Sequence, residues 1–454
     1  MCGIAGVHKK DGAAAFVAEA LFAEQHRGQD SCGVVSSGAS GLHLCKGLGL
    51  VKDVLTPEAV TSLPGDSAIG HVRYPTQGAP TLENAQPHIF ERDVRALFAI
   101  ASNGDLTNLP ELREIIESHG YKLEGSNDGE VIAKAIGVWA YDDGLGLEEA
   151  IAKWVRTGRG AFSTVLLTPD TLYAFRDPHG FRPMSVGDLE GSAVVCSETV
   201  ALDTLRARFV EEVPPGAIFR WGPDGHERKL GAASAPHRHC IFELIYFSRP
   251  DSRLFGESVF EVRRRIGELL AEGDETMGDI VIPIPDSANY MALGYAAARH
   301  LPFALGLVRN HYVGRTFIVP EQQMRDESVR LKFNPLPGFI KDKRIFVVDD
   351  SIVRGTTIRK LIRMLRENGA REVHLRIGSP PIRYSCYYGI DTPERDKLVA
   401  AYRSEAEVAA LLGADSLRYL PLEALKKSVA LPNDFCYACF TGDYPAGKKV
   451  RRKT

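Results

Sequence analysis

The sequence predicts two domains of different class: an α+β domain in the first half and an α/β domain with a parallel sheet in the second. The chain has 454 residues, more than one domain usually holds. Up to about residue 230, separate helical stretches lie between short β-like runs at 4–7, 42–45, 68–71, 97–102, 163–167 and 193–196. The small, proline-containing stretch 231–236 reads as a connector, so we place the domains at residues 2–232 and 233–454.

The second half alternates strands, loops and helices. Predicted strands at 279–284, 345–348 and 373–377 have helical segments between them, the pattern of a doubly wound parallel sheet. Such sheets bind ligands beyond the carboxyl ends of their strands. Both Pro285-Asp286-Ser287 and Asp349-Asp350 follow strands, so we expect the ligand site there.

Composition narrows the functional class. The net charge of −3 and the 25% of charged residues give no overall attraction to nucleic acid or to a membrane surface. No apolar run reaches transmembrane length and the N-terminus lacks a signal region, so we expect a cytoplasmic protein. Eight cysteines in so long a chain suggest buried thiols, a catalytic thiol or a metal site rather than a disulfide scaffold.

The most informative segment is IFVVDDSIVRGTT, residues 345–357. Its strand ends in Asp349 and Asp350, and residues 358, 361, 362 and 365 then repeat at helical spacing. Free N–H groups and the helix dipole make such a turn an anion site, while the acids suit sugar hydroxyls or hydrated Mg²⁺. We therefore predict that this segment binds a phosphorylated sugar; the alternative is an ordinary strand-to-helix turn with solvated acids. The loop between strand and helix consists of Ser351, Ile352, Val353, Arg354, Gly355, Thr356 and Thr357.

The chain opens Met1-Cys2-Gly3. Removal of Met1 would leave Cys2 with a thiol of pKa ~8.5 beside an α-amino group of pKa ~7.7–8.0. One residue would then supply both a nucleophile and a general base. By itself the motif does not exclude a Cys2 that merely starts a strand.

Further segments favour the nucleophile. The first half resembles the class II glutamine amidotransferases, which have an N-terminal-nucleophile fold, at residues 2–4, 25–29, 70–74, 103–104 and 127–130. The resemblance implies that Cys2 attacks the glutamine amide and that Asn103 and the N–H of Gly104 form the oxyanion hole. It also implies that Arg73 binds the glutamine carboxylate and Asp128 its ammonium group. The chain departs from the usual pattern at Ser102, Asp105 and Gly129, where relatives usually have His, Asn or Glu, and Ser.

The second half resembles the type I phosphoribosyltransferases. This implies that phosphoribosyl pyrophosphate (PRPP) is bound by the loop 349–357 with Arg315 and Lys332, and Mg²⁺ by Ser287, Asp349 and Asp350. Residues 309–335, rich in Arg and Lys, are expected to form a lid that PRPP orders.

Together the halves resemble the amidophosphoribosyltransferase family. Enzymes of this family convert PRPP and glutamine to 5-phosphoribosylamine, glutamate and pyrophosphate, the first committed step of de novo purine synthesis. The resemblance implies that ammonia released at Cys2 passes to the PRPP site. The resemblance further implies a homotetramer inhibited by purine nucleotides. Leu244 and His311 depart from the family pattern. Two alternatives are an amidotransferase with another acceptor, such as a hexosamine-forming synthase, and a PRPP-sensing regulator without catalysis.

Four cysteines form a separate candidate site. Cys436 and Cys439 make a C-x-x-C pair, and Cys240 and Cys386 stand where an iron–sulfur-containing subset of the family has ligands. Four thiolates suit a 4Fe–4S cluster and a Cys₄ zinc site alike, and spacing does not separate the two. The resemblance favours one 4Fe–4S cluster per subunit. Cys32, Cys45 and Cys196 are expected to be buried thiols.

Overall fold

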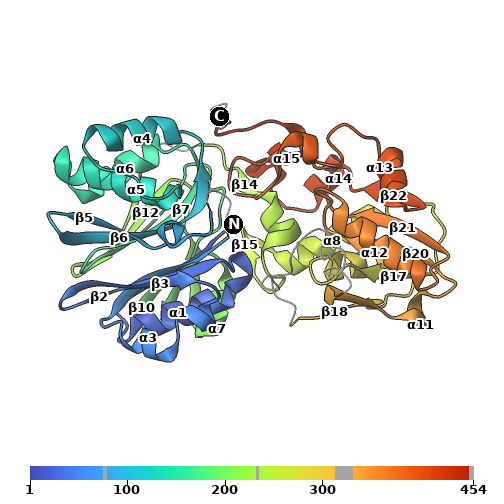
Figure 1. Cartoon of the computed structure of the whole chain (residues 1–454), viewed down its shortest axis with the longest axis horizontal. Helices are drawn as coiled ribbons and strands as arrows, with labels where there is room; N and C mark the ends of the chain where they lie inside the picture. The colour runs from blue at the N-terminus through green and yellow to red at the C-terminus, as the bar shows by residue number, and fades with distance from the viewer. Residues whose placement is uncertain (75–78, 232–234, 312–330, 449–454) are drawn as a thin grey trace.

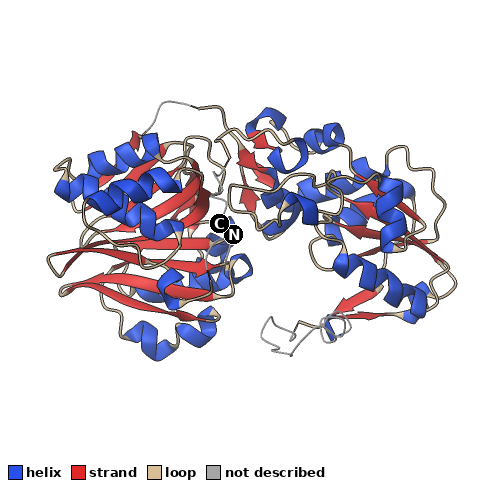
Figure 2. Cartoon of the chain, turned by 45° about the horizontal axis from the view of Figure 1, so that its top comes forward, coloured by secondary structure: helices blue, strands red, loops and turns tan. Residues whose placement is uncertain are grey.

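The computed structural model describes residues 1–74, 79–231, 235–311 and 331–448. Its first lobe contains two stacked antiparallel sheets with helices on both outer faces (Figures 1 and 2). The strand orders are β11-β9-β10-β1-β4-β2-β3 and β13-β12-β8-β7-β6-β5. The expected α+β class is confirmed.

The strands of the first sheet are β1 (Gly3–His8), β2 (Ser31–Gly38), β3 (Gly41–Leu48), β4 (Ser67–Arg73), β9 (Ser185–Leu189), β10 (Ser192–Cys196) and β11 (Arg208–Glu212). The second sheet contains β5 (His88–Arg92), β6 (Arg95–Leu106), β7 (Gly160–Leu167), β8 (Leu172–Arg176), β12 (Ala217–Gly222) and β13 (Gly225–Leu230). Helices on the first sheet are α1 (Ala13–Ala23), α2 (Val51–Val54), α3 (Pro57–Thr61) and α7 (Thr199–Leu205). Those on the second are α4 (Leu109–Ser118), α5 (Asp128–Gly137) and α6 (Leu147–Thr157).

The core of this lobe has three apolar layers. Strand β1 shows how the sequence builds them, because successive strand residues face opposite sides of a sheet. Ile4 packs between the two sheets, whereas Ala5 and Val7 pack under α1. The third layer, which includes Trp154, lies between the second sheet and α5 and α6.

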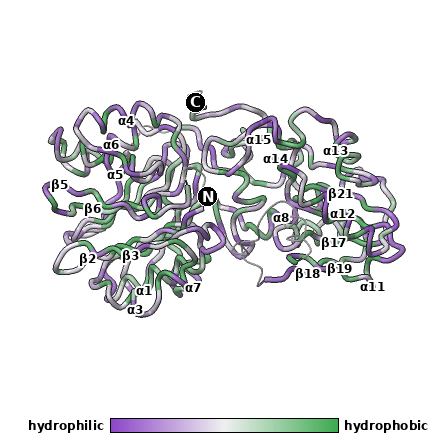
Figure 3. The backbone as a smooth tube through the Cα atoms, in the orientation of Figure 1, coloured by the Kyte–Doolittle hydropathy of each residue, from purple (hydrophilic) through white to green (hydrophobic). Residues whose placement is uncertain are grey.

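The second lobe contains the predicted parallel sheet, in the order β17-β20-β21-β22. Its elements are β17 (Ile280–Pro283), β20 (Arg344–Asp349), β21 (Glu372–Ile377) and β22 (Ser416–Tyr419), with α8 (Val259–Ala271), α9 (Asn289–Arg299), α12 (Thr356–Glu367) and α13 (Glu405–Leu412). Alternate residues again face opposite ways: Phe346 and Val348 pack with α8 and α9, Ile345 and Val347 with α12 and α13. Figure 3 shows hydrophobic segments concentrated along the strands of both lobes.

A hairpin of β18 (Leu307–Arg309) and β19 (Phe333–Pro335) flanks residues 312–330. The predicted lid at 309–335 therefore falls mostly outside the described residues, as does the predicted domain boundary at residue 232. Between the lobes, β14 (His239–Cys240) pairs in parallel with β23 (Phe435–Cys436). A π-helical turn, η4 (Glu243–Phe247), follows β14. Throughout the ranges given above, no helix combines the length and apolar character needed to cross a bilayer.

Candidate active site

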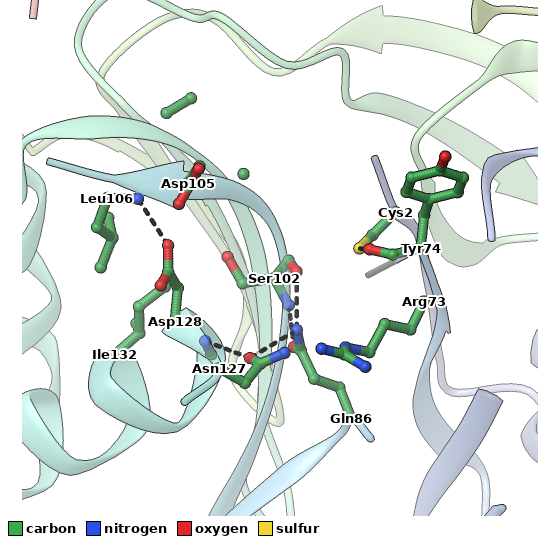
Figure 4. Close-up of a pocket in the computed structure, with 13 residues that line it drawn as sticks. Cys2, Arg73, Tyr74, Gln86, Ser102, Asp105, Leu106, Asn127, Asp128 and Ile132 are labelled. Carbon is green, nitrogen blue, oxygen red and sulfur yellow. Dashed lines mark hydrogen bonds between the residues drawn. The ribbon is translucent and has the colours of Figure 1, made fainter. Parts of the chain in front are cut away.

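Cys2 lies just before β1, at the edge of a small pocket (Figure 4). Its backbone N–H donates to Asn103 Oδ1 on β6 at 3.1 Å, and its Sγ lies 3.8 Å from the Tyr74 carbonyl oxygen. The pocket thus forms where the two sheets of the first lobe meet. It is lined by Cys2, Arg73, Tyr74, Gln86, Ser102, Gly104, Asp105, Leu106, Asn127, Asp128, Gly129, Ile132 and Ala161.

Asn103 and Gly104, the predicted oxyanion-hole residues, lie on β6 next to Cys2. Asn103 is 1% exposed and its Oδ1 is occupied by Cys2, while its Nδ2 has no partner within the described chain. A buried donor without a partner is costly, and an oxyanion forming beside it would supply that partner. At Gly104 a Cβ would lie 1.9 Å from the Ala161 carbonyl oxygen, because β7 runs alongside. The position therefore requires glycine.

Two opposite charges line the same pocket. Arg73 ends β4 and is 1% exposed, and burial lowers its pKa. Asp128 begins α5, and its Oδ2 accepts the Leu106 N–H at 2.6 Å. A guanidinium and a carboxylate on one pocket match the carboxylate and ammonium groups of a free amino acid.

The sequence analysis missed Gln86, which joins the pocket residues together. Its Oε1 accepts the Ser102 N–H at 2.8 Å, and its Nε2 donates to Ser102 O and Asn127 Oδ1, both at 3.1 Å. A Cβ at Gly129 would lie 2.6 Å from Gln86 Oε1. Gln86 thus contacts Ser102 and lies close to Gly129, two positions at which this chain differs from the usual family pattern. Those two differences were the only indication of Gln86 that the sequence offered.

The predicted phosphate-sugar site lies at the carboxyl ends of β17 and β20. Asp350 Oδ1 accepts the Ser287 hydroxyl at 2.5 Å, and its Oδ2 accepts the Ser351 hydroxyl at 2.6 Å. Asp349 Oδ1 accepts the Asp350 N–H at 2.9 Å. Burial raises the pKa of both carboxyl groups, and the neighbouring Asp350 charge raises that of Asp349 further. A bound cation would stabilise their ionised forms.

The loop that follows leads directly into α12. Gly355 has a φ of 76°, a left-handed conformation that favours glycine, and no side chain caps the helix that starts at Thr356. The first-turn N–H groups are therefore available to an anion. Ile352 is 1% exposed and packs in the core, so the loop presents its backbone rather than this side chain.

Arg315 and Lys332 are the other two predicted PRPP-binding residues. Arg315 is outside the described residues. Lys332 directly precedes β19: its carbonyl oxygen accepts the Asn310 N–H at 2.9 Å, and its ammonium group lies 5.4 Å from the Phe333 ring centre.

The four candidate cluster cysteines come together between the lobes. The β14–β23 register places Cys240 opposite Cys436, and Cys386 and Cys439 are close enough for their charges to affect these two. Burial raises the pKa of Cys240 to about 11 and raises those of Cys436 and Cys439 as well. Nevertheless, no group of three or more His, Cys, Asp or Glu in the described ranges is arranged to hold a metal ion.

The remaining thiols follow the sequence expectation only in part. Cys32 and Cys196 are buried, and Cys45 is half-buried. Burial raises the pKa of all three, which keeps them as neutral thiols.

Two protein-family models match the chain. A glutamine amidotransferase domain model matches residues 78–204, and a phosphoribosyl transferase domain model matches residues 256–377. The chain is 45% identical to amidophosphoribosyltransferase 1 (chloroplastic) of Arabidopsis thaliana, covering 98% of this chain and 78% of that protein. It is 41% identical to the amidophosphoribosyltransferase of Methanothermobacter thermautotrophicus, covering 98% and 94%.

Two solved structures match nearly the whole chain. One, described as the allosteric regulatory enzyme of purine biosynthesis, has a TM-score of 0.93 at 38% identity and covers 98% of this chain and 96% of its own. The other is glutamine PRPP amidotransferase from B. subtilis complexed with ADP and GMP. It has a TM-score of 0.92 at 37% identity and covers 100% and 99%.

Proposed function

The chain belongs to the amidophosphoribosyltransferase family, and on that premise we propose how its residues carry out the reaction. The family's activity is glutamine-dependent amination of PRPP, a step of purine biosynthesis. The observation that carries the assignment of residues is the hydrogen bond from the Cys2 N–H to Asn103, together with the pocket that Cys2 lines with Arg73 and Asp128.

Glutamine is hydrolysed at Cys2. Once Met1 is removed, the free amine of Cys2 takes the thiol proton, and the sulfur attacks the side-chain amide carbon of glutamine. Asn103 Nδ2 and the Gly104 N–H hold the resulting oxyanion, for which one donor is worth about 3 kcal/mol. The amine then protonates the leaving nitrogen, ammonia departs, and water hydrolyses the thioester to glutamate. Arg73 and Asp128 hold the substrate's carboxylate and ammonium groups.

The second half binds PRPP at the loop 349–357. Asp349 and Asp350 accept the ribose hydroxyls, and the N–H groups at the start of α12 bind the 5-phosphate, with Arg315 and Lys332 contributing positive charge. Ser287, Asp349 and Asp350 would hold a Mg²⁺ ion, which would supply positive charge to the pyrophosphate, since Mg²⁺ commonly uses one or two carboxylates together with substrate phosphates. Ammonia from Cys2 displaces pyrophosphate at C1 of the ribose.

Cys240, Cys386, Cys436 and Cys439 are proposed to hold one 4Fe–4S cluster. A zinc ion would draw four sulfurs to ~2.3 Å from a single centre. In a cluster each thiolate would bond a separate iron. Support for convergence of the four thiols comes from the pairing of Cys240 with Cys436 and from the effect of the four cysteine charges on one another, and the family resemblance favours iron over zinc. Metal and sulfide analysis of anaerobically purified protein tests this. About four irons and four sulfides per chain support it; stoichiometric zinc, or active protein without metal, contradicts it.

Assembly and regulation follow the family resemblance. We propose a cytoplasmic homotetramer inhibited by purine nucleotides; in support, the similar B. subtilis enzyme was solved with ADP and GMP. Sedimentation and nucleotide inhibition assays test both points.

The division of labour between the halves is tested by pyrophosphate release from PRPP. Cys2→Ala should lose the glutamine-dependent reaction and keep the ammonia-dependent one, because the second site is separate. A Cys2→Ala protein that still hydrolyses glutamine would contradict the nucleophile assignment.

A further inference from the structure

Arg27 links the nucleophile to a buried group of charges. It lies in the turn Gln25–Arg27, and its side chain is fully buried. Its Nε donates to the carbonyl oxygen of Cys2 at 2.9 Å. Its Nη1 forms an ion pair with Glu198, which precedes α7. The backbone of the proposed nucleophile is therefore held by a guanidinium whose own orientation depends on its carboxylate partners.

One of those partners comes from the other half of the chain. Glu243, at the start of η4, is fully buried and contacts Arg27 through both oxygens, Oε1 to Nη2 at 2.9 Å and Oε2 to Nη1 at 3.1 Å. Such a bidentate pair fixes both distance and angle. Glu243 also pairs with Arg182 at 3.3 Å and accepts the Ser248 hydroxyl at 2.9 Å. The position of Cys2 thus depends, through Arg27, on a carboxylate that lies 216 residues beyond Arg27 in the chain.

The same turn is held from the PRPP side. Arg263 on α8 is 2% exposed and donates to the carbonyl oxygens of Leu244, at 2.9 Å, and Ser248, at 2.8 Å. Helix α8 also packs closely on α9, which begins two residues after Ser287: a Cβ at Gly294 on α9 would lie 2.1 Å from the Arg264 carbonyl oxygen on α8. Arg27, next to the proposed glutamine site, and Arg263, on the side of the proposed PRPP site, therefore both form hydrogen bonds with the turn η4 and the residue after it.

We propose that Glu243 is a positioning residue for Cys2, and that Arg263, the turn η4 and Arg27 form the link through which an occupied PRPP site raises glutamine hydrolysis. This rests on the proposed roles of Cys2 and of the PRPP site at Ser287. Because α9 starts beside Ser287 and packs on α8, a movement of α9 on PRPP binding displaces Arg263 and the two carbonyl oxygens, of Leu244 and Ser248, that it contacts. Because Glu243 holds Arg27 in two places, the turn passes that shift to the Cys2 carbonyl.

The central test is Glu243→Gln, which keeps the shape and removes the charge. Glutamine hydrolysis in the presence of PRPP should fall roughly ten- to hundredfold, the range expected for losing charged hydrogen bonds. The KM for PRPP and the ammonia-dependent rate should stay near wild type. The matched control is Glu257→Gln, which removes another buried carboxylate of the same half, paired with Arg265 at 2.7 Å. It should lower the unfolding midpoint without changing PRPP stimulation.

A milder substitution tests whether an effect of Glu243→Gln arises only from general misfolding. Ser248→Ala removes one hydrogen bond to Glu243 but keeps the carbonyl that Arg263 contacts. It should reduce the PRPP stimulation of glutamine hydrolysis by roughly two- to tenfold. The proposal is overturned if Glu243→Gln and Ser248→Ala both keep full stimulation, or if both lose the ammonia-dependent rate in proportion. Cys2→Ala distinguishes failure of this proposal from failure of the proposed function: if this variant still hydrolyses glutamine, the assignment of Cys2 as the nucleophile is wrong.

Discussion

Replacing Asn103 by Ala should abolish most glutamine hydrolysis while sparing the second site. Two interactions are lost: the Nδ2 donor and the acceptor for Cys2 N–H at 3.1 Å. An oxyanion donor is worth about 10²–10³ in kcat, and one neutral hydrogen bond about 1 kcal/mol, or roughly another fivefold. The expected fall is therefore between about 10² and a few times 10³.

The assay is glutamate release at saturating glutamine, with ammonia-dependent pyrophosphate release measured on the same preparation. Most of the loss should appear in kcat rather than KM, because the donor acts on charge that exists only in the transition state. Asn108→Ala is the control: it removes another buried amide of the same lobe, which contacts the Arg159 N–H and the Thr157 carbonyl outside the pocket. A loss of less than about tenfold, or an equal loss of the ammonia reaction, would refute the reasoning.

Three further outcomes are expected. Protein that retains Met1 should lack glutamine hydrolysis and keep the ammonia reaction, because the base is the free amine of Cys2; mass spectrometry of active and inactive fractions checks this. Asp349→Asn combined with Asp350→Asn should abolish turnover of PRPP with either nitrogen source while basal glutamine hydrolysis persists without PRPP stimulation, and a wild-type ammonia rate would contradict it. Finally, the raised pKa of Asp349 means that the fold disfavours its charge, so the destabilisation is absent below about pH 4 and grows as pH rises toward the folded-state pKa. Asp349→Asn should therefore leave the ligand-free unfolding midpoint unchanged near pH 4 and raise it progressively toward pH 8, whereas a pH-independent difference would count against the assignment.

Much of the fold could be predicted from the local spacing of apolar residues. The strand at 345–348 and the helix after it were visible as apolar spacing, and β20 and α12 lie there. The alternation of strands and helices along the second half, also read from apolar spacing, predicted the parallel sheet. By contrast, β2 (Ser31–Gly38) was not identified, because its small and hydroxyl residues give no apolar run even though most of the strand is buried.

The site was predictable where it matched motifs and not where it depended on distant contacts. Motifs in the sequence indicate Cys2, Asn103 and Asp128; in the structure Cys2 and Asp128 line one pocket and Asn103 is hydrogen-bonded to Cys2, while their roles remain predictions. Gln86 contacts residues 16 and 41 positions away, and no periodicity encodes such a contact. Glu243 is still harder to find, since a single glutamate in an apolar stretch does not show which arginine it will meet.

The ion pairs of Glu243 also bear on the order of biosynthesis. A ribosome releases Arg27 and Arg182 long before Glu243, so the first lobe emerges with two guanidinium groups whose shared carboxylate does not yet exist. Burying those charges without that partner is unfavourable, which keeps this corner of the nascent lobe open to water. Closure around Cys2 must then wait for translation to reach the second half. We therefore expect a growing chain to hydrolyse glutamine only after the second half, which contains the proposed acceptor site, has been made.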